Sequence, residues 1–399
     1  MSLTSETFFF AVMALFLFVG SWLSRQVSFY RDLPELNNPG RLQSLDGLRG
    51  LLALSVFVHH GVITFFYYKR GFFSTPPSQF YTLIGQVSVL FFFTITGFLF
   101  WGKAITSKGR VNPGRLFFNR VRRIVPLYTV SVFAVILVAG YVRNFNTQGE
   151  GEDVVGDLAK MLSMGFINWT MLFGMKASVI NSNVHWTLQY EWIFYAALPL
   201  LALVLMNRSV LKAAVFLALV ATVANAISTP EVVIWPYFFV GMVMAHLAAH
   251  RKTQLPSRSP LLLAVVLVPL VVIFLIPIHA AVNWPVLPLL AISFTPLALG
   301  FDCYGFLAGR GMRCLGTLSY SIYLLHGILL YVSAYILHRL YPIPSMSAWQ
   351  WWAYMAAMGV LLVMICSLTY RFIEFPFLRS SKPASKTDSA VAVSQPASA

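Results

Sequence analysis

Long apolar runs separated by short polar segments dominate the sequence from residue 7 to residue 372. An α-helix rises 1.5 Å per residue, so about 20 apolar residues cross the ~30 Å hydrocarbon core of a bilayer. Eleven runs meet or approach this length, and each is predicted to be a membrane-spanning helix. They lie near residues 7–24, 46–66, 82–101, 124–142, 187–206, 211–228, 233–249, 260–278, 285–301, 315–337 and 350–372.

Composition excludes the main alternatives to a membrane bundle. Hydrophobic residues make up 58% of the chain and charged residues only 10%, whereas an ordinary soluble protein is about 25% charged. Neither a water-soluble surface nor a disordered chain can be built from these residues. The expected fold class is therefore an all-α polytopic membrane protein.

The net charge of +15 comes from 28 Lys and Arg against 13 Asp and Glu. In a soluble protein this excess would point to nucleic acid, but the positive-inside rule explains it better, and no nucleic-acid partner is expected. With segment 25–45 placed in the cytoplasm, 21 basic residues fall on that side and six fall outside. We therefore expect the N-terminus outside and the C-terminus in the cytoplasm.

Three parts are predicted along the chain. Residues 1–41 contain an N-terminal span and a cytoplasmic linker; no positive charge precedes the span, which favours an uncleaved helix over a signal peptide. Residues 42–379 form the main membrane domain. Residues 380–399 are rich in Ser, Ala and Pro and are expected to be a disordered cytoplasmic tail. The outer connection 143–184 is too short for a separate catalytic domain.

Ionisable side chains inside a span are costly, so each is a functional hypothesis. Arg49 and His60 are eleven residues apart, and at 100° per residue they share one helix face with Asp46. His60 would lie roughly 16 Å deeper than Arg49. An imidazole there can act as a general base, although a histidine that only hydrogen bonds a neighbouring helix is the alternative.

Seven basic residues and no acidic residue occupy segment 103–128. Arg120 and Arg123 are three residues apart, so one helical turn would direct both at one anion, such as a phosphate. Topology and contact with anionic lipid are the expected roles of three others: Lys103, Lys108 and Arg110.

Thr187, Glu191 and Tyr195 repeat every four residues, which places them on one face of a predicted helix. Glu191 is expected near the outer end of this span, where a carboxylate could orient the catalytic histidine or bind a hydroxyl-bearing acceptor. The alternative is an interfacial carboxylate bonded to Tyr190 or Tyr195.

A polar stripe of Ser319, Tyr323 and His326 follows helical spacing and is best explained by hydrogen bonds between helices. Glu374 and Pro376 fall at an inner helix end and are interpreted as a structural stop.

Five motifs occur in order between residues 42 and 379. They are Asp-Gly-Leu-Arg-Gly with Arg-x10-His, Arg-x-x-Arg ahead of a proline, Trp-x-Leu-x-x-Glu, Ser-Tyr-x-x-Tyr-x-x-His and Ile-Glu-x-Pro. Together they resemble the acyltransferase-3 family, integral membrane enzymes that acylate sugars of lipopolysaccharide O-antigen, exopolysaccharides, nodulation factors and antibiotics. The resemblance implies a ten-helix bundle, here with one extra N-terminal transmembrane helix.

This resemblance also implies a reaction. Acetyl-CoA would be the co-substrate, with no bound cofactor and no metal, and the acceptor would be a carbohydrate or lipid-linked glycan at a bacterial inner membrane. Arg49, Arg120 and Arg123 would bind the acyl-CoA donor, while His60 and Glu191 would be catalytic. Supporting roles are expected for Asp46, Trp186, Tyr190, Tyr323 and His326.

A transporter or flippase of a lipid-linked sugar or acyl group is the competing interpretation. Short helices interrupted at matching positions of two halves would favour it. Four prolines interrupt only one half: Pro277, Pro285, Pro288 and Pro296. A membrane scaffold or sensor would leave the shared face of Arg49 and His60 unexplained.

Overall fold

A computed structural model describes residues 2–37, 43–146, 154–167, 169, 171–205, 234–251, 255–277 and 285–379. The predicted span at 211–228 and the predicted tail at 380–399 lie outside these residues. Within them, the secondary structure is helical apart from one short antiparallel hairpin, Met171–Leu172 (β1) and Met175–Lys176 (β2). The predicted all-α class is confirmed for this part of the chain.

Among the described residues, six helical segments are long and apolar enough to cross a membrane. They are α1 (Glu6–Gln26), α4 (Gln43–Arg70), α5 (Gln79–Thr106), α6 (Pro113–Arg143), α15 (Ser319–Leu340), and α16 (Ala348–Thr369), which continues into α17 (Phe375–Arg379). Other apolar helices are α9 (Trp186–Leu205), α11 (Trp235–His250), α12 (Pro260–Leu275) and α13 (Val286–Ala298). Short helices are α2 (Ser28–Arg31), α3 (Pro34–Asn37), α7 (Val154–Leu162), α8 (Ala177–Ile180) and α14 (Arg310–Thr317), with a 3-10 turn at Ile343–Ser345.

Three predicted spans are shorter than expected. The runs at 233–249, 260–278 and 285–301 form α11, α12 and α13, with 16, 16 and 13 residues. A helix needs about 20 residues to cross the hydrocarbon core alone. The structure therefore supports a polytopic membrane protein, while the count of eleven spans stays a prediction.

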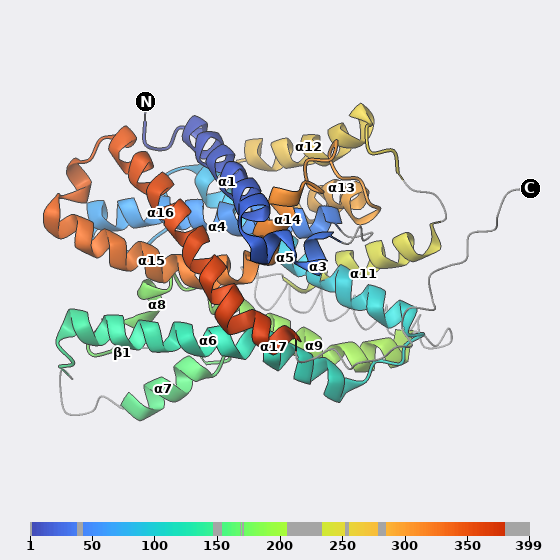
Figure 1. The fold of residues 1–399 in the computed structure, drawn as a ribbon, viewed down its shortest axis with the longest axis horizontal. Coiled ribbons are helices and arrows are strands. Elements are labelled where there is room, and N and C mark those ends of the chain that lie inside the picture. The colour runs from blue at the N-terminus through green and yellow to red at the C-terminus, as the bar shows by residue number, and fades with distance from the viewer. Residues whose placement is uncertain are drawn as a thin grey trace, which may run out of the picture.

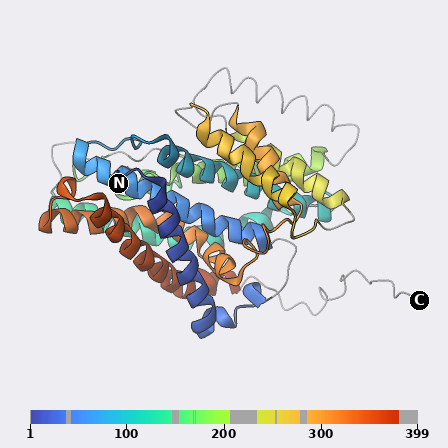
Figure 2. The ribbon, with the colours of Figure 1, turned by 90° about the horizontal axis from the view of Figure 1, so that it is seen from above.

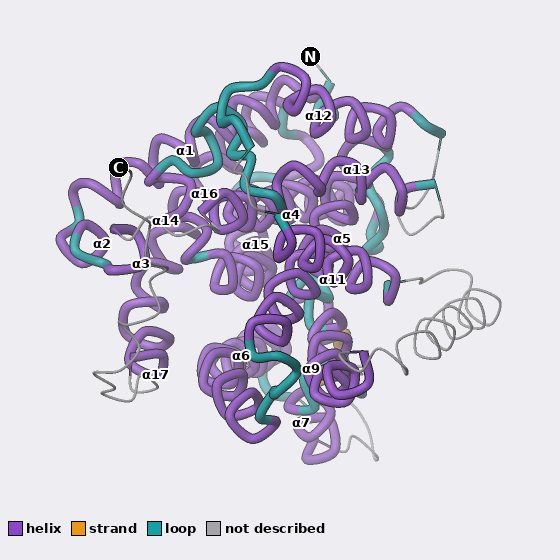
Figure 3. Tube along the Cα trace, turned by 90° about the vertical axis from the view of Figure 1, so that its right-hand side faces the viewer, coloured by secondary structure: helices purple, strands orange, loops and turns teal. Residues whose placement is uncertain are grey.

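The helices pack as a bundle in which α4 contributes to both buried apolar clusters. Figure 1 shows α6 and α9 along one side and α12 and α13 along the opposite side, an arrangement also seen in Figure 3. Leu48 and Leu52 of α4 belong to one buried apolar cluster, and Phe57 and Val62 belong to the other. Outward-facing leucines on α12, such as Leu261 at 73% exposed, indicate a surface that meets lipid.

The helix after residue 112 begins earlier than its apolar pattern indicates. The Asn112 side chain accepts a hydrogen bond from the backbone N–H of Arg115, and Pro113 occupies the first turn. Both features favour a helix start. Arg120 and Arg123 therefore lie on α6 itself instead of in a loop before it.

The predicted stop at Glu374 and Pro376 is wrong. The helix continues through a π-helical turn, Tyr370–Glu374, into α17. Pro376 is the second residue of α17. Glu374 is only 1% exposed and accepts a hydrogen bond from the Ser321 hydroxyl of α15.

The predicted span at 315–337 is interrupted at Leu318, which separates α14 from α15. α14 packs closely against α4: a Cβ on Gly47 would lie 1.9 Å from the Leu307 carbonyl oxygen, and one on Gly316 would lie 1.9 Å from that of Asp46. No side chain fits either position. Gly47, from the Asp-Gly-Leu-Arg-Gly run, thus fixes the base of α4 next to Arg49.

The N-terminal segment is tied to this base by two arginines of α14, of which Arg313 donates one hydrogen bond, to the Leu36 carbonyl oxygen at 2.8 Å. α1 packs against α14 and α16 (Figure 2). The guanidinium group of Arg310, the first residue of α14, donates four hydrogen bonds to this segment. Its acceptors are the carbonyl oxygens of Ser24 (3.1 Å), Tyr30 (3.2 Å) and Arg31 (2.6 Å) and the side-chain oxygen of Asn37 (2.7 Å).

Candidate active site

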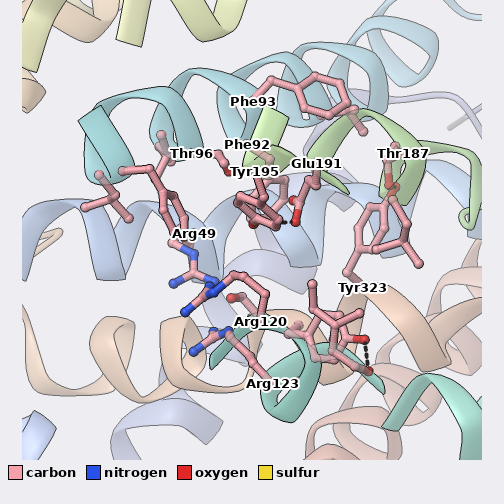
Figure 4. A pocket seen from close by; sticks show the side chains of 18 of the residues that line it. Arg49, Phe92, Phe93, Thr96, Arg120, Arg123, Thr187, Glu191, Tyr195 and Tyr323 are labelled. Carbon is pink, nitrogen blue, oxygen red and sulfur yellow. Dashed lines mark hydrogen bonds between the residues drawn. The ribbon is translucent and has the colours of Figure 1, made fainter. Parts of the chain in front are cut away.

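A cationic cavity of about 300 Å³ opens among α4, α5, α6, α9 and α15. Figure 4 shows the guanidinium groups of Arg49, Arg120 and Arg123 gathered on one side of it. Lys103 and a single carboxylate, Glu191, also line it. Among the described residues, no ion pair joins any of these cations to a carboxylate. The cavity therefore concentrates positive charge around a single carboxylate.

Two polar atoms at this cavity are buried without a hydrogen-bond partner in the described structure: Nε of Arg120 and Oγ of Ser319. The guanidinium group of Arg120 also lies 4.9 Å from the ring centroid of Phe100, where cation–π attraction holds it in place. Buried polar atoms are nearly always hydrogen bonded. A ligand in this cavity that accepts hydrogen bonds could satisfy the Nε–H of Arg120.

Glu191 is the sixth residue of α9. It lines the cavity with the arginines, and its Oε2 accepts a hydrogen bond of 2.9 Å from the Tyr195 hydroxyl. The segment before α9 packs against α15. The Tyr323 hydroxyl donates to the Val184 carbonyl at 3.3 Å, and a Cβ on Gly327 would lie 2.3 Å from the Asn181 carbonyl carbon.

A second cavity of about 380 Å³ surrounds His60. Trp186 and Tyr190 of α9 line it, and so do the amide side chains of Gln86 and Asn183. The two cavities share Val89 and Tyr323 as lining residues, so they are neighbours.

Arg49 and His60, predicted to share a face of α4, thus each reach one of the two cavities. Asp46 lines neither cavity and is exposed at the start of α4.

Hydrogen bonds from α15 connect the elements around His60. Nε2 of His326 lies 3.0 Å from Nδ1 of His60, and the Tyr323 hydroxyl lies 3.0 Å from Oγ1 of Thr187. The polar stripe of α15 therefore joins neighbouring helices, as its spacing predicted. His60 has no contact with Glu191 or Asp46 among the hydrogen bonds of the described residues. In the same part of the chain, no group of three or more His, Cys, Asp or Glu could hold a metal ion.

Three lining residues were missed or misassigned from the sequence. Lys103 was assigned to topology and lipid but reaches the cationic cavity. Gln86 carries the only amide side chain in the apolar run 82–101, which was a usable signal because polar groups in a span are seldom idle. Asn183 offered no local signal: it and Ser182 adopt left-handed backbone angles, φ 57° and 55°, which only the tertiary packing explains.

A helical membrane bundle with a cationic cavity beside a buried histidine defines a class of integral membrane protein that handles an anionic ligand. A model of the acyltransferase-3 family, described as an acyltransferase domain, matches residues 42–371. The chain belongs to this family and is a membrane acyltransferase. No curated protein and no solved structure matches it.

Proposed function

We propose that the protein transfers an acetyl group from cytoplasmic acetyl-CoA to a hydroxyl of a cell-surface carbohydrate, such as lipopolysaccharide O-antigen or exopolysaccharide, at the bacterial inner membrane. The observation that carries this proposal is the adjacency of the two cavities. One gathers four cations around a single carboxylate, and the other contains His60. An anionic donor and an uncharged acceptor can thus meet at their common wall.

The cationic cavity fits the phosphate end of the donor. Guanidinium forks bind phosphate oxygens through paired hydrogen bonds, and Arg120 has a buried Nε with no partner in the described chain. The eleven residues from Arg49 to His60 correspond to a helix rise of roughly 16 Å. The pantetheine arm would extend along this distance and pass Tyr323, which lines both cavities.

The His60 cavity fits the acceptor. Trp186 and Tyr190 provide aromatic faces, while Gln86 and Asn183 provide amide groups. This mixture of apolar surface and a few polar groups is typical of sites that orient a small hydroxylated ligand. With the expected topology, the acceptor reaches this cavity from the outer side.

In the proposed reaction, His60 takes the proton from the acceptor hydroxyl as its oxygen attacks the thioester carbonyl carbon. The carbon–sulfur bond then breaks, and the leaving CoA thiolate takes up the proton. Glu191 serves the donor cavity in this scheme, because its carboxylate bonds Tyr195 and lies among the arginines.

The test compares purified wild-type protein with His60→Ala. We expect the variant to bind CoA with unchanged affinity and to lose at least about 100-fold in transfer of labelled acetyl from acetyl-CoA to surface polysaccharide, since a general base contributes roughly 10²–10⁴-fold. His250→Ala, at the exposed end of α11, is the matched control and should transfer normally. Retained transfer in His60→Ala would remove His60 from the mechanism, and export of a lipid-linked sugar without label transfer by wild type would favour a transporter.

A further inference from the structure

We infer that His326 is a positioning residue that fixes the proton of His60 on Nδ1 and so presents the unprotonated Nε2 to the reacting hydroxyl. This inference rests on the proposed function, in which His60 is the general base. The juxtaposition that carries it is the 3.0 Å contact between Nε2 of His326 and Nδ1 of His60.

The backbone acceptors decide which nitrogen carries each proton. Nδ1 of His326 lies 3.0 Å from the Ile322 carbonyl oxygen, and a carbonyl oxygen only accepts hydrogen bonds. In a neutral imidazole, His326 therefore carries its proton on Nδ1, and its Nε2 is an acceptor. The facing Nδ1 of His60 must then be the donor.

A second carbonyl oxygen leads to the same assignment. Nδ1 of His60 also lies 3.1 Å from the Val56 carbonyl oxygen. A bare Nδ1 on His60 would place a lone pair against that oxygen, and the matching tautomer of His326 would place another against Ile322. Both repulsive contacts disappear when His60 is protonated on Nδ1.

The remaining nitrogen of His60 is the one suited to catalysis. His60 lines the 380 Å³ cavity, and its Nε2 has no hydrogen-bond partner among the described residues. A neutral histidine with Nδ1 protonated has its lone pair on Nε2. His326 thus leaves Nε2 of His60 as the unprotonated nitrogen. This nitrogen lies on the side of the ring away from His326 and is available to a bound hydroxyl.

Packing holds His326 in this position. Its side chain is 0% exposed, and its ring centroid lies 4.9 Å from that of His60. The next residue, Gly327, lies so close to the Asn181–Ser182 backbone that a Cβ would come within 2.3 Å of it. α15 therefore cannot rotate His326 away without displacing the loop that lines the cavity.

His326 also has a role after proton transfer. Once Nε2 of His60 has accepted the hydroxyl proton, the ring is a cation with both nitrogens protonated. Its Nδ1–H still points at two acceptors, Nε2 of His326 and the Val56 carbonyl oxygen. An oriented acceptor behind a catalytic histidine is the arrangement that carboxylates supply in hydrolase triads; here a neutral imidazole supplies it.

The kinetic test uses two substitutions at the same position. His326→Phe keeps the ring volume without an acceptor, and His326→Gln keeps an acceptor oxygen on a flexible side chain. We expect His326→Phe to lower kcat by about 100-fold with KM for acetyl-CoA unchanged, and His326→Gln to recover a large part of that loss. His338→Gln, which replaces another histidine of the same helix, is the matched control. Wild-type kcat in His326→Phe, or equal losses in Phe and Gln, would overturn the inference.

A spectroscopic test reads the tautomer directly in the wild-type protein. In wild-type protein labelled with ¹⁵N-histidine, NMR should show His60 with Nδ1 protonated and Nε2 bare, with the signal assigned by its loss in His60→Gln. The opposite tautomer would overturn the inference even if acyl transfer is confirmed. Absence of transfer with the expected tautomer would instead contradict the proposed function alone.

Discussion

Two sets of arginines in this protein have opposite surroundings. Arg310 donates four hydrogen bonds, all to oxygens of the N-terminal segment. Arg49, Arg120 and Arg123 share one cavity, form no ion pair with a carboxylate of the described chain, and include a buried Nε with no partner.

In the proposed function, the difference separates a structural arginine from arginines that bind the donor. A guanidinium group has five N–H donors in a fixed fork. When oxygens of the chain accept these bonds, the arginine holds segments together. When the chain brings several such groups together around a single carboxylate, the cavity attracts an anion that supplies further acceptors.

The largest expected effect comes from removing Arg120 and Arg123 together. Arg120→Ala combined with Arg123→Ala should weaken CoA binding by at least about 100-fold, because each hydrogen bond to a charged group contributes roughly 1.5–3 kcal/mol. The melting temperature should stay the same or rise, since like charges are removed. Calorimetric titration of purified protein with CoA measures the first quantity and a thermal melt the second. An unchanged affinity would remove both residues from the donor site.

A smaller effect, on the stability of the fold instead of on CoA binding, is expected at Arg310. Arg310→Ala should lower the free energy of unfolding by about 2 kcal/mol, given roughly 0.5–1.5 kcal/mol per hydrogen bond and the partial exposure of the side chain. Arg310→Lys should restore little, because an ammonium group cannot reproduce the fork. CoA affinity of the folded protein should not change. A variant with normal stability and lost affinity would break the distinction between the two sets.

The smallest effect is expected at Lys103. It lines the cationic cavity but is exposed, so solvent and salt screen its charge. Lys103→Gln should weaken CoA binding by about three-fold at low ionic strength and by less in 0.5 M salt. Lys108→Gln is the matched control, since Lys108 is exposed and lines neither cavity. Equal losses in the two variants would mean that only general surface charge acts here.

The sequence predicted those parts of the site that depend on one helix. An α-helix turns by 100° per residue, which relates Arg49 to His60 and Arg120 to Arg123 without knowledge of the neighbouring helices. In the structure, Arg120 and Arg123 line the same cavity, and Arg49 and His60 line two neighbouring cavities, as expected. The packing of residues 181–184 against α15 was not predictable in this way, because it depends on tertiary contacts. Charge counting could not separate Arg310 from Arg120 either, since both carry the same positive charge.

One continuous helix carries both Arg49 and His60. α4 runs from Gln43 to Arg70 without a proline, so helix geometry sets the interval between the two positions at roughly 16 Å. In the proposed reaction, α4 therefore sets the distance between the donor-binding Arg49 and the catalytic His60. Only donors whose reactive carbon lies at this distance from their charged end are accepted. Inserting a single residue between the two positions would rotate His60 by about 100° and increase its distance from Arg49 along the helix by about 1.5 Å. Selectivity for the donor would then depend on the length of helix between Arg49 and His60 as much as on the side chains that contact the donor.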